Sequence, residues 1–346
     1  MSRFIIGANG KIFQSLDNFC KLRGVALANT ATPRWIASQK QHRDFLINAR
    51  VTDHLQFSPV RILARVVYSD NIYFCMIGFQ QEKLQENAFE NDLDPAILTV
   101  LLSELGPTPT ASVAQIRNIV EATDKMSDAD YNGHHYIAVR DLFPTIRIFS
   151  LRPCPPSTSN IFFKACIEEL TIGNSWVDEQ LIRTLRTVSN LDEEHIPYEV
   201  LCRSIFDSDP SSFYLALYRC LEALYAYSSA RDVISSLNLS NPWTEVAIVL
   251  EDTLGWHPRE DSSLQKLLAG CATSDLLMFL KALGIDCSES SDSDLRRQGA
   301  SKIYWLRNAI VHYRPIHQSL HLSGFKWAEL CNALAGIILD VYNAVL

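Results

Sequence analysis

The first half of the chain mixes two spacings of hydrophobic residues. Runs rich in β-branched and aromatic residues predict β-strands at residues 60–68, 71–79, 136–139 and 145–151. The first two runs are separated only by Ser69-Asp70, which predicts a β-hairpin. Apolar residues at helical spacing predict helices over residues 94–105 and 112–123. We therefore expect an α+β domain in this half.

The second half shows helical periodicity throughout. It predicts helices over residues 162–170, 176–188, 197–206, 211–237, 243–254, 263–283, 302–313 and 326–346. Before it, Arg152-Pro153-Cys154-Pro155-Pro156 cannot continue a helix or a central strand, because proline lacks a donor N–H and fixes φ. The pattern predicts an α+β domain over 1–152, a helical connector over 153–205 and an all-α helical bundle over 206–346. The first of these is a candidate sensor or regulatory domain.

One segment, Ser288 to Asp294, is acidic and rich in serine. Such a composition is typical of a solvated, mobile loop between two helices. A gating or modifiable loop is the alternative, because the segment directly precedes the helix predicted over 302–313.

The composition is typical of a folded, soluble protein. Hydrophobic residues make up 47% of the 346 residues and charged residues 20%. The apolar run Phe4-Ile5-Ile6 is too short for the core of a signal peptide. Polar residues interrupt the apolar segment 327–346, so we expect a packed helix and not a membrane span. These features predict a cytoplasmic protein with no membrane segment.

The nine cysteines are scattered singly, and no two form a Cys-x-x-Cys pair. Zinc binding and disulfide exchange are therefore not expected. Most cysteine side chains should be buried in the fold, in a protein that resides in a reducing compartment. The formal net charge of −8 argues against a broad basic surface, because neutralising many phosphates requires many cations. We expect any contact with nucleic acid to be local.

The helix predicted over 302–313 carries the strongest chemical signal. A helical wheel places Ile303, Leu306 and Ile310 on one face, which should anchor the helix in its bundle. Asn308 and His312 are i, i+4 neighbours on another face. Arg307 lies between that face and the apolar face, so the helix presents a basic and a titratable group together.

These residue types are sufficient for RNA cleavage without a metal or cofactor. His312 can take the proton of a 2′-hydroxyl or give one to the leaving 5′-oxygen, and Arg307 can stabilise the charge of the phosphorane. Asn308 could orient the imidazole or contact phosphate. Pro315 should end the helix near His312, where the helix dipole favours a charged imidazole. One histidine cannot be both acid and base in one step, so a second copy from a dimer partner is expected.

The segment Leu306-Arg307-Asn308-Ala309-Ile310-Val311-His312 resembles the motif helix of the HEPN superfamily (higher eukaryotes and prokaryotes nucleotide-binding). The helix at 214–224 is similar to the first helix of such domains, and the resemblance covers about residues 206–346. It implies a bundle of four to five helices that dimerises into one metal-independent endoribonuclease cleft. Arg307 and His312 would be the catalytic pair and Asn308 the auxiliary polar residue. Tyr313 departs from the family, where a small residue often follows the histidine.

The resemblance also implies a biological class and partners. Members commonly act as toxins or as effectors of defence against phage, restrained until a sensor is triggered. The implied partners are RNA, a second copy of the chain, and a sensor or antitoxin protein. Two alternatives remain open: a catalytically inactive HEPN module that dimerises or binds a partner protein, and an unrelated helical interaction domain.

Several other residues are candidates for the site. Tyr304, Tyr313 and Arg314 could stack on or hold an unpaired nucleotide, or could pack in an interface. The i, i+5, i+9 spacing of His312, His317 and His321 across a proline turn does not converge on one metal.

Four further polar residues are expected to be structural or solvent-exposed. His134 and His135 follow a turn signature, which predicts exposed loop histidines. Arg219 and Glu222 are expected to form structural hydrogen bonds.

Overall fold

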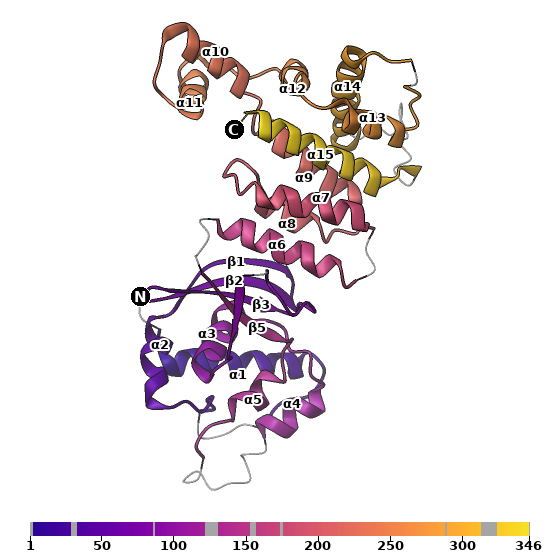
Figure 1. Ribbon diagram of the computed structural model, residues 1–346. Coiled ribbons are helices and arrows are strands. Elements are labelled where there is room, and N and C mark those ends of the chain that lie inside the picture. Colours follow the sequence, from indigo (N-terminus) through magenta and orange to yellow (C-terminus); the bar gives the residue numbers. More distant parts are fainter. Residues whose placement is uncertain are drawn as a thin grey trace. The chain divides into compact units, whose positions relative to one another are not determined.

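The computed structural model describes residues 3–28, 33–85, 87–121, 131–152, 157–173, 176–287, 289–312 and 324–345 (Figure 1). The chain divides into two compact units, Met1–Ile161 and Phe162–Leu346. The first contains a β-sheet with helices, and the second is helical. This agrees with the predicted order of an α+β region followed by an all-α region.

The first unit is built on a five-stranded antiparallel sheet with the strand order β1-β2-β3-β5-β4. Its strands are β1 (Arg50–Ser58), β2 (Arg61–Tyr68), β3 (Asn71–Ile77), β4 (Ala88–Asn91) and β5 (Ile146–Leu151). The predicted hairpin is confirmed, since Tyr68 pairs with Asn71 across the turn at Ser69-Asp70. The predicted strand 145–151 is confirmed as β5. The two edge strands, β1 and β4, were not predicted.

Helices supply the rest of the first unit's core. They are α1 (Ile5–Lys21), α2 (Arg43–Asn48), α3 (Pro95–Leu105), α4 (Val113–Val120) and α5 (Tyr136–Arg140), with a 3₁₀ turn at Lys40–His42. Facing positions of β2, β3 and β5, such as Ala64, Cys75 and Ile148, form rows across the sheet and share a hydrophobic core with α1 and α3. The prediction of a strand at 136–139 is wrong, because this segment forms α5. A helix of five residues spans little more than one turn, so its periodicity cannot be told from that of a strand.

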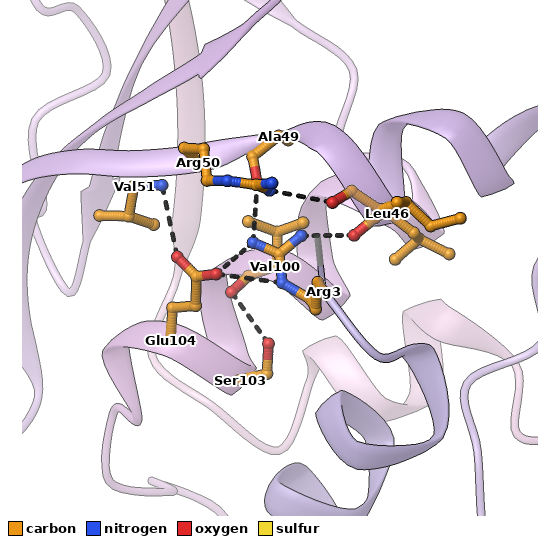
Figure 2. A network of polar contacts seen from close by, with 9 residues as sticks. Arg3, Leu46, Ala49, Arg50, Val51, Val100, Ser103 and Glu104 are labelled. Atoms are coloured by element: carbon orange, nitrogen blue, oxygen red, sulfur yellow. Dashed lines mark hydrogen bonds and ion pairs between the residues drawn. The ribbon is translucent and has the colours of Figure 1, made fainter. Parts of the chain in front are cut away.

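A buried arginine ties the elements of this unit together (Figure 2). The Arg3 guanidinium donates to the backbone oxygens of Leu46 (2.5 Å) and Ala49 (2.9 Å) and forms an ion pair with Glu104. The other oxygen of Glu104 accepts from the backbone N–H of Val51 at 3.3 Å. The start of the chain is thereby joined to α2, β1 and α3.

His134 corrects a second prediction, because it is not an exposed loop residue. Only 4% of His134 is exposed. Its backbone pairs with the segment around Trp35 and Ala37 through N–H···O bonds of 2.8 Å, and its ring lies 5.0 Å from that of Phe13. Burial, with the nearby charge of Arg34, lowers the pKa of His134 to about 4. His135 is exposed as predicted.

The second unit is a set of helices, of which α7, α9, α12 and α13 pack against α15. Its elements are α6 (Thr158–Leu170), α7 (Glu179–Asn190), α8 (Tyr198–Ser204), α9 (Pro210–Glu222), α10 (Tyr227–Leu237), α11 (Trp243–Leu254), α12 (Glu260–Leu268), α13 (Thr273–Ala282), α14 (Asp292–Val311) and α15 (Trp327–Val345). By length and composition α15 could cross a membrane, but 56% of its apolar window is buried, and it packs against α7, α9 and α13. It is the core helix of this unit (Figure 1).

Some helix boundaries differ from the predicted ones. The helix expected over 211–237 is divided into α9 and α10, and the helix expected over 263–283 is divided into α12 and α13. The acidic segment predicted as a loop contributes the start of α14, because the Ser291 side chain accepts from the backbone N–H of Asp294. An N-cap serine and acidic residues in the first turn stabilise a helix N-terminus.

The cysteines follow the prediction where they are described. Eight are buried, as was predicted for most of them. Cys154 lies outside the described residues.

Candidate functional site

The motif helix α14 is held in the bundle by the apolar face that the sequence predicted. Ile303 and Leu306 are fully buried, and Ile310 is half-buried. The helix packs against α9, α12 and α13. The buried hydroxyl of Tyr214 on α9 donates to the backbone oxygen of Ile303 at 2.9 Å. These contacts fix the rotation of α14, and with it the direction of the polar residues.

His312 lies at the end of this helix. The helix ends at Val311, and His312 is the C-cap residue. Its backbone N–H donates to the backbone oxygen of Asn308 at 2.8 Å. The side chain is exposed and has no hydrogen-bond partner among the described residues. Tyr304 and Asn308 precede it at four-residue intervals, so they line one stripe of the helix that leads to the imidazole. Pro315, the predicted stop signal, lies outside the described residues.

Arg307 is anchored by three oxygen atoms. Its Nη1 donates to Oδ1 of Asn308 at 2.9 Å, and its Nη2 donates to Oε1 of Glu222 at 3.3 Å. The same Nη2 forms an ion pair with Oε1 of Glu260 at 3.7 Å. Asn308 therefore orients the arginine; no bond from its side chain to His312 is seen among the described residues.

The surroundings of Arg307 are largely closed to solvent. Its side chain is 20% exposed, and its Cζ lies 5.7 Å from the ring centre of Tyr218. Behind that ring, the hydroxyl of Tyr225 donates to the hydroxyl of Tyr218 at 2.5 Å, and both tyrosines are buried. Burial acts to lower the pKa of the Arg307 guanidinium, but the charges of Glu260 and Glu222 outweigh it and raise the pKa. The guanidinium is a permanent cation.

The structure adds residues that sequence reasoning missed. Trp305 is 38% exposed, and the Nζ of Lys302 lies 5.4 Å from the centre of its ring. An exposed aromatic ring beside a cation is a surface on which a nucleobase can stack. A helical wheel could have identified Trp305, because it places this tryptophan outside the apolar face of the motif helix. Glu260 gave no such signal, because it comes from a distant helix.

The remaining candidates divide into those that the structure describes and those that it does not. Tyr304 is half-buried on the stripe that leads to His312. Glu222 makes the expected hydrogen bond, and its partner is Arg307 itself. Arg219 was expected to bond in the same way, but it is exposed and makes no side-chain hydrogen bond within the described part of the chain. The remaining candidates, Tyr313, Arg314, His317 and His321, lie outside the described residues.

No group of three or more His, Cys, Asp or Glu side chains that could hold a metal occurs among the residues that were described. Comparisons with protein-family models, curated protein sequences and solved structures found no match to this chain.

Proposed function

We propose that the helical unit is a HEPN-type domain and that the protein is a metal-independent endoribonuclease. The observation that carries this proposal is the end of α14. Arg307 is held there by Asn308 and two carboxylates, and the imidazole of His312 is exposed just beyond the last turn. A fixed cation and a free titratable group on one short segment are the two components that cleavage through the 2′-hydroxyl requires.

The proposed reaction uses the RNA's own nucleophile. One imidazole takes the proton of the 2′-hydroxyl, the 2′-oxygen attacks phosphorus, and the bond from phosphorus to the 5′-oxygen breaks. A second, protonated imidazole gives its proton to the leaving 5′-oxygen. Arg307 stabilises the negative charge on the phosphorane. Because the two imidazoles must differ in protonation, the site is composed of two copies of the chain.

Within this proposal, RNA contacts are local to the motif helix. Trp305 with Lys302 and the half-buried Tyr304 supply aromatic surface for unpaired bases. We assign Tyr313 and Arg314, which follow His312 directly, to the same substrate surface. The chain would act in the cytoplasm as a regulated toxin or anti-phage effector, with the sheet-containing unit as the sensor. Its partners would be RNA, a second copy, and a sensor or antitoxin protein.

A catalytically inactive HEPN module that dimerises or binds a protein partner is the second candidate. Two observations favour it. The first is that two carboxylates already neutralise Arg307. The α10–α11 hairpin also exposes large apolar side chains, among them Leu237, Ile248, Val249 and Leu254. Where such side chains form a contiguous patch, they mark an interaction surface.

Incubation of the full chain with single-stranded RNA in EDTA separates the two candidates. The endoribonuclease proposal expects fragments that end in a 2′,3′-cyclic phosphate, and loss of this activity in His312→Ala. His257→Ala is the matched control, because His257 is an exposed histidine of the same unit, with a side chain that is 70% exposed and paired with Glu251. Cleavage that persists in His312→Ala, or that requires a divalent metal, would overturn the assignment. Absence of cleavage by a folded, dimeric wild-type protein would favour the inactive module.

A further inference from the structure

The charges around Arg307 do not balance. Oε1 of Glu222 and Oε1 of Glu260 both approach the same nitrogen, Nη2, at 3.3 and 3.7 Å. The cluster therefore holds two negative charges against one positive charge. A phosphodiester that approached Arg307 in this arrangement would meet a net negative site, and like charges at such distances repel strongly in a partly buried environment. One carboxylate has to leave before Arg307 can bind phosphate.

Glu222 is the better anchored of the two. Its Oε1 accepts a hydrogen bond from Nη2 of Arg307 at 3.3 Å, whereas Glu260 accepts none among the described residues. It is the carboxylate expected to stay.

Glu260 is held more weakly. Its Oε1 is within ion-pair range of Arg307 but makes no hydrogen bond to it, and its Oε2 is buried without a hydrogen-bond partner among the described residues. A buried carboxylate oxygen without a donor is costly, so this side chain gains hydration when it moves out. It is also the first residue of the nine-residue helix α12, which follows the α10–α11 hairpin. Rotation of the Glu260 side chain out of the cluster would break no hydrogen bond among the described residues.

We infer that Glu260 occupies the phosphate-binding side of Arg307 and is displaced when RNA binds. The carboxylate is a built-in competitor for the substrate phosphate, while Glu222 and Asn308 keep the guanidinium in place. The inference rests on the proposed function, because it takes the phosphate of RNA as the competing anion. It also gives the two carboxylates opposite roles, which a purely structural ion-pair cluster would not have.

Equilibrium binding of a labelled, mixed-sequence single-stranded RNA tests this inference. His312→Ala serves as the reference protein, so that cleavage does not interfere. Adding Glu260→Gln removes one negative charge while keeping the shape of the side chain, and should tighten RNA binding about fivefold or more. Two unit charges about 4 Å apart interact with about 1 kcal/mol even in water, which corresponds to a factor of about five in affinity. Adding Glu222→Gln should not tighten binding in the same way, because it loosens Arg307.

Two controls make the effect specific. Glu245→Gln removes one negative charge from α11, where the Glu245 side chain accepts a bond from Asn241, and should leave RNA affinity nearly unchanged. Arg307→Ala should weaken binding, and in its presence Glu260→Gln should have a clearly smaller effect, because two coupled groups are non-additive in a double-mutant cycle. Equal tightening by Glu245→Gln would attribute the effect to net charge and overturn the inference.

The results also separate this inference from the proposed function. The inference is overturned if Glu260→Gln binds RNA as the reference protein does or more weakly, even if the wild-type protein cleaves RNA. It is also overturned if no variant binds RNA. Tighter binding that depends on Arg307 supports it even if the wild-type protein does not cleave. In a cleaving protein, Glu260→Gln should raise kcat/KM chiefly through a lower KM, because the change acts on binding.

Discussion

Acidification is expected to destabilise the sheet-containing unit through the buried imidazole of His134. In the folded chain burial holds the pKa of His134 at about 4, against an ordinary value of 6.5. Between these values the unfolded chain binds a proton that the folded chain does not, so the free energy of unfolding falls as the pH falls. One pKa unit corresponds to about 1.4 kcal/mol, so the full loss is about 3 kcal/mol and the loss at pH 5 is about 2 kcal/mol. Above pH 6.5 the contribution is complete.

Urea unfolding of the full chain at pH 7.5 and pH 5 measures this loss. The side chain of His134→Gln cannot titrate. Between pH 7.5 and pH 5 this variant should therefore lose about 2 kcal/mol less of its free energy of unfolding than the wild-type protein loses. His135→Gln is the matched control, because His135 is exposed and its replacement should keep the wild-type pH dependence. Equal pH dependence of wild type and His134→Gln would refute the reasoning.

Three further predictions concern local contacts and are tested by urea unfolding. Gly78→Ala should lower the free energy of unfolding by about 2 kcal/mol or more, because the new Cβ would lie 1.9 Å from a backbone oxygen at a φ of +72°. Gly106→Ala, at a φ of +57° with no atom within 4 Å, should lower it by only about 1 kcal/mol. Equal losses for the two variants would contradict the steric argument. Ser291→Ala should cost about 1 kcal/mol by removing the N-cap of α14, whereas Ser291→Thr should keep most of it; an unaffected Ala variant would show that the cap contributes nothing. Glu104→Gln should cost about 2 kcal/mol, because Arg3 would keep a buried charge without its ion pair, and an unchanged midpoint would argue against the network in Figure 2.

The parts of the fold that could be predicted are those whose signals are local. The β2–β3 hairpin follows from two β-rich runs separated by two residues, and α3 follows from Pro95 inside an apolar-periodic segment. The anchoring face of α14 follows in the same way from helical spacing. The edge strand β1 was missed because it has a single fully buried residue, Leu55, and an edge strand needs no strong alternation of apolar and polar residues.

The parts of the candidate site that could not be predicted depend on tertiary contacts. Arg307, Asn308 and His312 are close in sequence, so their spacing reveals them. Glu222 and Glu260 reach Arg307 from other helices, and the charge of a single glutamate does not show where it will lie. His134 was misjudged for the same reason, since its turn sequence is local but its burial depends on the segment around Trp35.

The most direct test of a composite Arg307/His312 site is subunit mixing. Wild-type protein and His312→Ala are unfolded and refolded together in varying ratios, and the initial rate of RNA cleavage is measured in EDTA at constant total protein. If acid and base come from two copies, only dimers with both histidines are active. The rate should then follow the square of the wild-type fraction, reaching about a quarter at an equal mixture. A rate proportional to the wild-type fraction would contradict the composite site, and cleavage by His312→Ala alone would contradict the site itself.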